Sequence, residues 1–472
     1  MPKVTKTAPD KPVTPPPASA PASPQPAPLR SDFTRREFFA TLMGASAVAV
    51  AAGSLGLAGC SPEGEDKSEL ETIVAQTAQD APVATLNVAE DQVVAASDFE
   101  EAPYTNYLVL EKTFDLPINT LIFQDSPRFL ATLMPGAQGE ALTKMGFFDL
   151  EAGAMTVVME QALAHDEDYV LYDVRANDTT IIWVECNLAT ANWRVHLAPV
   201  TQYGTNAAAP LGTAHLVDEG GIDYEPPQLC VSGTKAYWTV MPDPNGPASQ
   251  EDSYFKAAAV LSTGDAVAEV ETVCVSHGRM ITNPRATQGI VTVVPRVDID
   301  GIYYQITALD ESSNAVVAVD ILPQSMRVIE AVYMGGSFSF CTEDNYEYAE
   351  GLQFYGTYRE LASGSYLHVN RMPTVAPVLM GDILIVKSTK SVVGIDAQAQ
   401  RFFAIDTLAD CATYGDVLAA CGVQDKVVTY TTVTPREGGG AGTTKVRVFA
   451  KATSAEAGVE AGAETDGETG ES

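Results

Sequence analysis

A recurring strand–turn–strand pattern limits the folds open to this chain more than any other feature of its sequence. Short runs of β-branched and aromatic residues, such as Thr180–Val184, Lys235–Val240 and Ile290–Val294, are separated by Gly, Asp, Asn and Pro. Runs of this length and composition predict antiparallel strands. Because helical periodicity is almost absent between residues 104 and 451, we expect an all-β fold.

Polar turns within this pattern recur at intervals of about 50 residues, which is the length of one four-stranded propeller blade. Each turn is interpreted as part of the outer hairpin of a blade. The turns fall near Asp149, Thr201, Ser262, Asp310, Ser363 and Asp396. This period predicts a β-propeller with seven four-stranded blades, and six or eight blades are the alternatives. A two-sheet sandwich is the competing architecture, but it gives no reason for a period.

The composition divides the chain into four parts. A Pro-, Ala- and Ser-rich leader together with an apolar signal segment occupies residues 1–59, and residues 60–102 are expected to form a flexible acidic tether that starts at a cysteine. The propeller is expected at 103–452, before a disordered acidic tail at 453–472. Within the propeller, residues 106–113 form a strand ahead of the first blade, which could pair with the last blade and close the ring.

The segment before the tether resembles two bacterial targeting signals. Arg35, Arg36 and Phe38 lie at the matching positions of the twin-arginine export signature, ahead of an apolar run. The run ends in Leu57–Cys60, which is similar to a bacterial lipobox. That resemblance implies that the Cys60 thiol accepts diacylglycerol and that a peptidase cuts before it, so acyl chains such as palmitate would hold the protein at a membrane. An uncleaved N-terminal membrane anchor is the alternative.

Taken together, these signals and the blade period resemble twin-arginine-exported lipoproteins of bacterial envelopes whose propeller is loosely TolB-like. The resemblance implies a lipid-anchored protein at the extracytoplasmic face of the bacterial cell membrane. It also implies a non-catalytic binding or scaffolding module, with membrane lipid held through Cys60 and an envelope protein or glycan as partner. It carries over no catalytic residue.

Charge and motif content narrow the function further. The net charge of −33 repels nucleic acid. The chain contains no HExxH, GxSxG, Walker A or GxGxxG motif. We therefore predict no catalytic residue, no cofactor and no metal site. An envelope enzyme, either a propeller hydrolase or lyase or a cofactor-dependent oxidoreductase, remains the alternative function.

One segment concentrates positive charge in this acidic chain. His277, Arg279, Arg285 and Arg296 fall within twenty residues. Arginine side chains can hold a carboxylate or phosphate through paired hydrogen bonds, so these four residues are the candidate site for an anionic ligand. The alternative is that the arginines pair internally with the surplus carboxylates.

Six cysteines remain once Cys60 is assigned to the lipid anchor. An even number in an exported protein allows disulfides, and Cys411 with Cys421 is the favoured pair because the two are close in sequence. Buried free thiols are an equally good interpretation for most of the six.

Overall fold

The computed structural model describes residues 85–136, 142–201, 211–261, 266–280, 282–298, 301–324, 326–343, 356–370, 375–435 and 442–452. All of them belong to the second of the chain's two units, Gly53–Ser472. The predicted export residues Arg35, Arg36 and Phe38, the lipidation residue Cys60 and the acidic tail at 453–472 lie outside the described residues.

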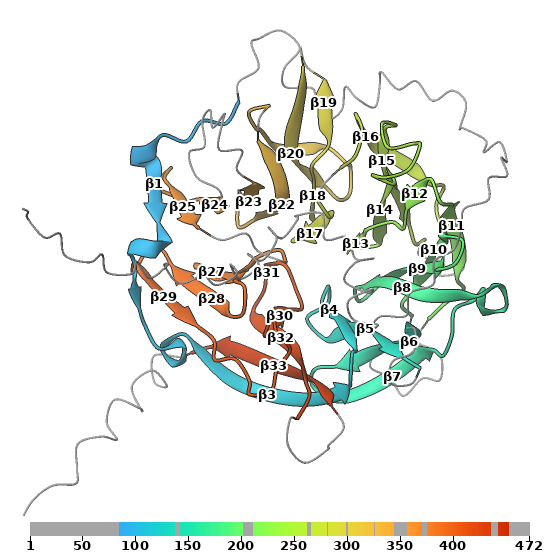
Figure 1. The fold of residues 1–472 in the computed structure, drawn as a ribbon, viewed down its shortest axis with the longest axis horizontal. Helices are drawn as coiled ribbons and strands as arrows, with labels where there is room; N and C mark the ends of the chain where they lie inside the picture. The colour runs from blue at the N-terminus through green and yellow to red at the C-terminus, as the bar shows by residue number, and fades with distance from the viewer. Residues whose placement is uncertain are drawn as a thin grey trace, which may run out of the picture. The chain divides into compact units, whose positions relative to one another are not determined.

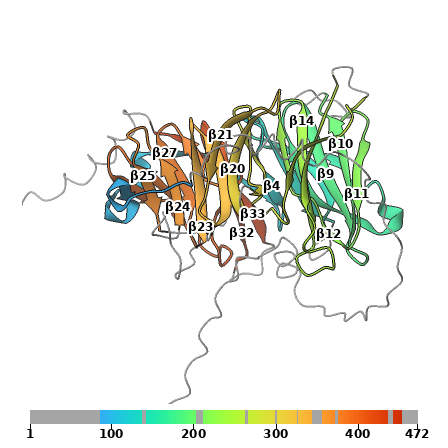
Figure 2. The same cartoon turned by 90° about the horizontal axis from the view of Figure 1, so that it is seen from above.

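In the described part of the chain, the strands pair into seven sheets that stand around a common axis (Figure 1). Seen from above, the strands of neighbouring sheets stand side by side around the ring (Figure 2). This arrangement is a β-propeller, which confirms the predicted fold class. Six sheets are built on a run of consecutive strands, two of them with an added strand from the N-terminal side, and the seventh combines strands from both ends of the described chain. The count is therefore six continuous blades, or seven with the composite sheet, within the predicted range.

The first four blades follow one another along the chain. Blade 1 contains β4 (Leu121–Phe123), β5 (Phe129–Pro135), β6 (Leu142–Asp149) and β7 (Ala154–Met159). Blade 2 contains β8 (Tyr169–Ala176), β9 (Thr180–Asn187), β10 (Asn192–Pro199) and β11 (His215–Gly220). Blade 3 contains β12 (Tyr224–Glu225), β13 (Leu229–Ser232), β14 (Lys235–Pro242), β15 (Ser253–Ala259) and β16 (Glu271–Ser276). Blade 4 contains β17 (Arg285–Thr287), β18 (Ile290–Val293), β19 (Arg296–Asp298), β20 (Ile302–Asp310) and β21 (Val316–Ile321).

The remaining blades recruit strands from elsewhere in the chain. Blade 5 contains β22 (Arg327–Met334), β23 (Ser337–Glu343), β24 (Gly356–Glu360) and β25 (Tyr366–Val369). Blade 6 contains β26 (Val378–Met380), β27 (Ile383–Lys387), β28 (Val392–Asp396) and β29 (Arg401–Ala404), with β31 (Gly422–Val423) parallel to β26. Blade 7 contains β30 (Val417–Leu418), β32 (Lys426–Val433), β33 (Thr443–Lys451) and β3 (Leu108–Pro117). Short 3₁₀ helices lie at η1 (Glu90–Gln92), η2 (Ala96–Asp98), η3 (Tyr104–Asn106) and η4 (His165–Glu167).

The predicted turns lie where the blade period placed them, between the last two strands of a blade. Asp149 ends β6, Asp310 ends β20 and Asp396 ends β28. Each aspartate caps its own turn: Asp149 Oδ1 accepts hydrogen bonds from the amides of Glu151 and Ala152 at 2.8 and 2.7 Å. The weaker turns near Thr201 and Ser363 occupy the same place in blades 2 and 5, and Ser262 itself lies outside the described residues.

The ring is closed by a strand from the N-terminal side of the propeller. β3 pairs antiparallel with β33, from Leu108 opposite Lys451 to Pro117 opposite Thr443. The closing strand predicted at 106–113 is therefore confirmed, although it begins slightly later and runs further. β3 is therefore the outermost strand of blade 7 and covers the outer edge of β33.

Residues 85–102 differ from the expectation of a flexible tether. β1 (Val93–Ala95) pairs parallel with β25, and β2 (Glu100–Glu101) pairs parallel with β29. This outer segment packs because its scattered apolar side chains are buried: Val88, Ala96, Phe99 and Ala102 are each at most 8% exposed. The N-terminal segment therefore adds strands to the outer edges of blades 5, 6 and 7 in turn.

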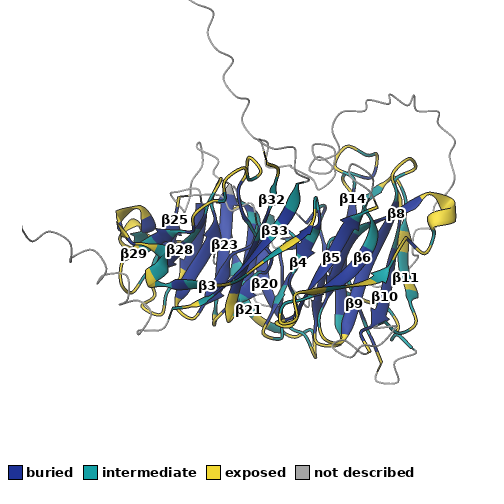
Figure 3. Cartoon of the chain, turned by 90° about the horizontal axis from the view of Figure 1, so that it is seen from below, coloured by how far each residue is buried: buried dark blue, intermediate teal, exposed yellow. Residues whose placement is uncertain are grey.

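The hydrophobic core lies between neighbouring blades and not in one central mass. Trp183 packs between blades 1 and 2, whereas Trp193 and Trp238 pack between blades 2 and 3. All three indoles are at most 1% exposed. In Figure 3 the strands are mostly buried and the exposed residues concentrate at their ends and turns.

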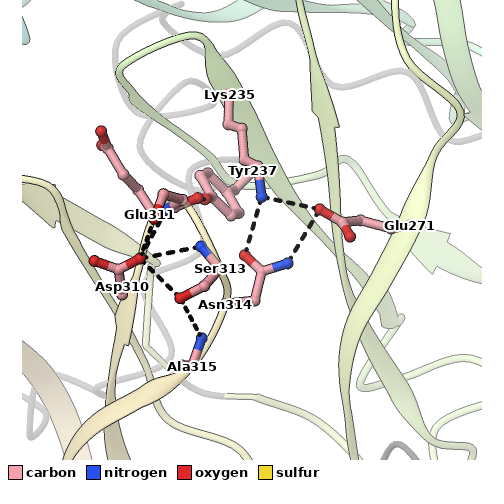
Figure 4. A network of polar contacts seen from close by, with 9 residues as sticks. Lys235, Tyr237, Glu271, Asp310, Glu311, Ser313, Asn314 and Ala315 are labelled. Atoms are coloured by element: carbon pink, nitrogen blue, oxygen red, sulfur yellow. Dashed lines mark hydrogen bonds and ion pairs between the residues drawn. The ribbon is translucent and has the colours of Figure 1, made fainter.

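Polar contacts also hold neighbouring blades together, as Figure 4 shows for blades 3 and 4. Lys235 Nζ donates to Glu271 Oε1 at 3.2 Å and to Asn314 Oδ1 at 3.4 Å. Tyr237 Oη donates to the carbonyl oxygen of Glu311 at 3.1 Å. The outer turn of blade 4 is thereby fixed against β14 of blade 3.

The close packing inside a blade predicts a sharp effect at Gly394 in β28. A Cβ atom at this position would lie 2.0 Å from Cζ of Phe403, whose ring is fully buried. We expect Gly394→Ala to lower the free energy of unfolding by about 1–3 kcal/mol through overpacking, measured by urea denaturation. Gly246→Ala is the control, because its nearest neighbours are 3.2 Å or more away. An equal loss of stability in both variants would contradict the assignment to Phe403.

Candidate functional site

The four positively charged residues singled out by the sequence do not form one group. His277 and Arg279 lie between β16 and β17, Arg285 begins β17, and Arg296 begins β19. The amide of His277 donates to the carbonyl oxygen of Arg296 at 2.9 Å, so these two residues are neighbours. Arg279 and Arg285 point to different carboxylates, which is the internal pairing that the sequence left as the alternative.

Arg279 is bound within blade 3. Its Nη2 donates to Glu225 Oε2 at 2.8 Å, and its Nη1 contacts the carbonyl oxygen of Pro242. The Arg296 guanidinium instead lies over the Tyr304 ring, 5.8 Å from the centroid. Arg296 also donates its amide to Ser276 Oγ at 2.9 Å. Of the four residues, only His277 and Arg296 therefore stay together, and anion binding there stays a prediction.

The structure reveals a different charged group around the propeller axis. Arg285 on β17 donates to Glu330 on β22 through two parallel hydrogen bonds, Nε to Oε1 at 2.9 Å and Nη2 to Oε2 at 2.6 Å. Arg175 on β8 contacts Asp125, which follows β4, at 3.3 Å. The first pair joins the first strands of blades 4 and 5, and the second joins the loop after β4 in blade 1 to the first strand of blade 2. We call these four residues the axial ion pairs.

Burial decides the electrostatics of the axial ion pairs. Both side chains of the Arg285–Glu330 pair are 9% exposed. Burial raises the pKa of Asp125, and the opposing effect of Arg175 does not cancel it. At Arg285 burial acts to lower the pKa, but the Glu330 carboxylate outweighs it and the pKa is raised. The two arginines therefore remain charged, and each is compensated by a carboxylate from a neighbouring blade.

Two thiols lie in the same electrostatic environment. Cys230 on β13 and Cys421 beside β31 are free, and the charges of Asp125, Arg175 and Arg285 act on both. Burial raises the pKa of each thiol, so both are protonated and weak nucleophiles at neutral pH. Cys230 is buried, whereas Cys421 is only partly buried.

The favoured disulfide between Cys411 and Cys421 is not present. Both residues are free thiols. Cys411 forms a backbone bridge with Val433 at the end of β32, whereas the carbonyl of Cys421 accepts a hydrogen bond from Gln424 beside β31. The two cysteines therefore lie beside different strands, although they are close in sequence.

Sequence reasoning missed three of the four axial residues: Asp125, Arg175 and Glu330. It searched for clusters along the chain, and these residues are 45 to 50 positions from their partners. That separation is close to the blade period, so a search for opposite charges one period apart in sequence would have found both pairs. Choosing the right residues would also have required knowing which strand of each blade lies nearest the axis.

The described ranges lack two kinds of feature. No group of three or more His, Cys, Asp or Glu side chains there is arranged to hold a metal ion. Nor does any helix in those ranges have the length and apolar character needed to cross a membrane.

The closed ring of sheets and its buried axial ion pairs define the chain as a β-propeller protein. No protein-family model matches it. No curated protein matches it either.

Solved structures similar to this chain include an acylaminoacyl peptidase in complex with Z-Gly-Gly-Phe-chloromethyl ketone, at 12% identity and a TM-score of 0.37, over 57% of this chain and 44% of that one. BamB from Moraxella catarrhalis matches at 11% identity and a TM-score of 0.36, over 73% and 99% of the two chains. The polysaccharide lyase Uly1 matches at 10% identity and a TM-score of 0.41, over 80% and 95%. This chain thus spans less than half of the peptidase, and all three identities are too low to transfer an activity.

Proposed function

We propose that the protein is a lipid-anchored binding or scaffolding module at the extracytoplasmic face of a bacterial membrane. In this proposal Arg35 and Arg36 direct export, Cys60 carries the acyl chains, and the propeller binds an envelope protein or glycan. The observation that carries the proposal is the order of features in one chain: twin arginines, an apolar run that ends in Leu57–Cys60, and a propeller.

The described site supports a scaffold. The axial arginines Arg175 and Arg285 are each paired with a carboxylate from a neighbouring blade, so these pairs connect blades 1 and 2 and blades 4 and 5. The closure of the ring by β3 and the inter-blade cores make a rigid body. Such a body can present fixed surfaces to a partner without large ordering costs.

Replacing the lipidation residue gives the direct test. We expect Cys60→Ala, expressed in a bacterium with twin-arginine export, to lose acyl incorporation completely and to move from the membrane to the soluble extracytoplasmic fraction. The reason is that the thiol is the acyl acceptor and the acyl chains supply the membrane affinity. Mass spectrometry of the processed N-terminus and fractionation measure the two effects.

Cys411→Ala is the matched control, because Cys411 is a free thiol that lies far along the sequence from the export and lipidation residues. This variant should keep acylation and membrane location. Unchanged acylation and fractionation in Cys60→Ala would refute the anchor. The double variant Arg35→Lys/Arg36→Lys should leave the unprocessed chain in the cytoplasm.

A further inference from the structure

One end of blade 2 presents three exposed aliphatic side chains. Leu163 is 51% exposed, Leu188 is 52% exposed and Ile222 is 68% exposed. Leu163 precedes β8, Leu188 follows β9 and Ile222 follows β11.

The strand register places all three at the same end of the sheet. Tyr169 at the start of β8 lies opposite Asn187 at the end of β9. Gly220 at the end of β11 lies opposite Trp193 near the start of β10. Four strands at a spacing of about 4.8 Å cover about 15 Å, so the three residues lie beyond the same end of a sheet of about that width.

A buried carboxylate holds the segment that carries Leu163. The Glu185 side chain is fully buried and accepts hydrogen bonds from the amides of Leu163 at 2.7 Å and Ala164 at 3.0 Å. Trp183 Nε1 donates to the same carboxylate at 3.1 Å. The Leu163 backbone is therefore fixed from inside the blade, while its side chain faces solvent.

The turn that carries Leu188 is held by its own first residue. Asn187 Oδ1 accepts hydrogen bonds from the amides of Ala189 at 3.0 Å and Thr190 at 3.1 Å. Asn187 Nδ2 donates to the carbonyl oxygen of Glu167 at 2.9 Å, which joins this turn to η4. The segments carrying Leu163 and Leu188 therefore form one connected structure.

Trp193 fixes the turn that carries Ile222. Gly220 packs so closely on the indole that a Cβ atom would lie 2.2 Å from Cζ2 of Trp193. Trp193 Nε1 donates to the carbonyl oxygen of Tyr224 at 3.2 Å, and the Tyr224 amide donates to the carbonyl oxygen of Gly221 at 3.0 Å. These contacts hold the residues on both sides of Ile222, so its backbone position is fixed.

Acidic side chains surround these apolar residues. Asp166, Glu167 and Glu219 have side chains that are 92, 61 and 66% exposed. Arg194 lies between two of them, 3.0 Å from Glu167 and 3.7 Å from Glu219, and its guanidinium stacks on the Tyr169 ring. One arginine does not balance these carboxylates, so the rim keeps a negative charge.

Rigid turns that hold large apolar side chains in water are typical of an interaction surface. Exposed apolar groups that lie together mark binding sites in soluble proteins. Because the backbone is already fixed, binding there orders few additional groups. We define the blade 2 surface as Leu163, Leu188 and Ile222 with the acidic rim of Asp166, Glu167 and Glu219.

We propose that the blade 2 surface docks a partner protein through a segment with an apolar anchor flanked by Lys or Arg. The apolar anchor covers Leu163, Leu188 and Ile222, and the basic flanks face the acidic rim. This inference rests on the proposed function as a binding module, and it adds the surface and the chemistry of the partner segment.

A random peptide library displayed on phage and selected on the full-length chain provides the test. We expect the enriched peptides to combine apolar residues with flanking Lys or Arg. Their affinity, measured by fluorescence polarisation with the synthesised peptides, should fall at least about tenfold in Leu188→Asp/Ile222→Asp. It should also weaken as salt is raised, because the rim contributes electrostatically.

Val157→Asp/Val317→Asp is the matched control, since these valines are 39 and 49% exposed on the outer strands of blades 1 and 4. It should bind the peptides like the unmodified chain. Thermal unfolding should be the same in all three proteins, because every replaced side chain is already exposed.

Three results would overturn the proposal. They are no enrichment of peptides from the library, enrichment of acidic peptides, or equal affinity of the peptides for Leu188→Asp/Ile222→Asp and for the unmodified chain. Binding to phosphatidylcholine or phosphatidylglycerol vesicles that depends on Leu188 and Ile222 would also overturn it, because the surface would then contact lipid. Peptides that bind both double variants equally would reject this surface and still support a binding module. Failure of acylation at Cys60 would reject the anchor alone.

Discussion

Leu108→Asp is expected to lower the free energy of unfolding by about 4 kcal/mol or more, because it places a charge in the core that closes the ring. Leu108 begins β3, is 1% exposed, and packs in a cluster that includes Phe403 and Phe449. If β3 detaches, the edge of β33 becomes free and apolar surface from the last blade is exposed. Urea denaturation followed by tryptophan fluorescence measures the loss of stability, and size-exclusion chromatography should detect aggregation.

Leu110→Asp provides the control on the same strand. Leu110 is 44% exposed, so the same chemical change there should alter stability by less than about 1 kcal/mol. Leu108 and Leu110 both pair with β33, opposite Lys451 and Phe449. A similar loss in both variants would mean that strand pairing, and not the buried contact of Leu108, determines closure.

The fold could be predicted because its repeating signals are local. Asp149, Asp310 and Asp396 cap turns within their own hairpins, so the sequence near each turn contains the information that forms it. The exceptions depend on distant parts of the chain. β31 pairs with β26 of blade 6 although β30 of blade 7 precedes it, and β1 pairs with β25 far along the sequence. Nothing near these short strands indicates their partners.

The site was harder to predict because its contacts connect blades. Arg285 was recognised as unusual in an acidic chain, but its partner Glu330 is 45 positions away. Arg175 and Asp125 are 50 positions apart. These separations are close to one blade period, which explains why each pair connects two neighbouring blades. The sequence contained the period, but the residues that face the axis depend on strand register.

The same axial geometry leads to the second large effect. Arg285→Ala is expected to lower the free energy of unfolding by about 3–5 kcal/mol, because it leaves the Glu330 carboxylate buried without its partner. The pair is held by two hydrogen bonds, and each side chain is 9% exposed. Urea denaturation at neutral pH measures the loss, with far-ultraviolet circular dichroism to follow the β-sheets.

The double variant Arg285→Met/Glu330→Leu separates the cost of an unpaired charge from the value of the pair. It should recover most of the stability lost in Arg285→Ala, because apolar side chains of similar volume can replace a buried ion pair at little cost. Arg401→Ala is the surface control, since Arg401 and Glu100 form an ion pair at 2.8 Å with 46 and 76% exposed side chains, and its loss should cost less than about 1 kcal/mol. If the double variant were as unstable as Arg285→Ala, the axial pair would stabilise the ring through its own attraction. Recovery of stability would instead show that the buried Glu330 carboxylate is destabilising unless Arg285 is paired with it.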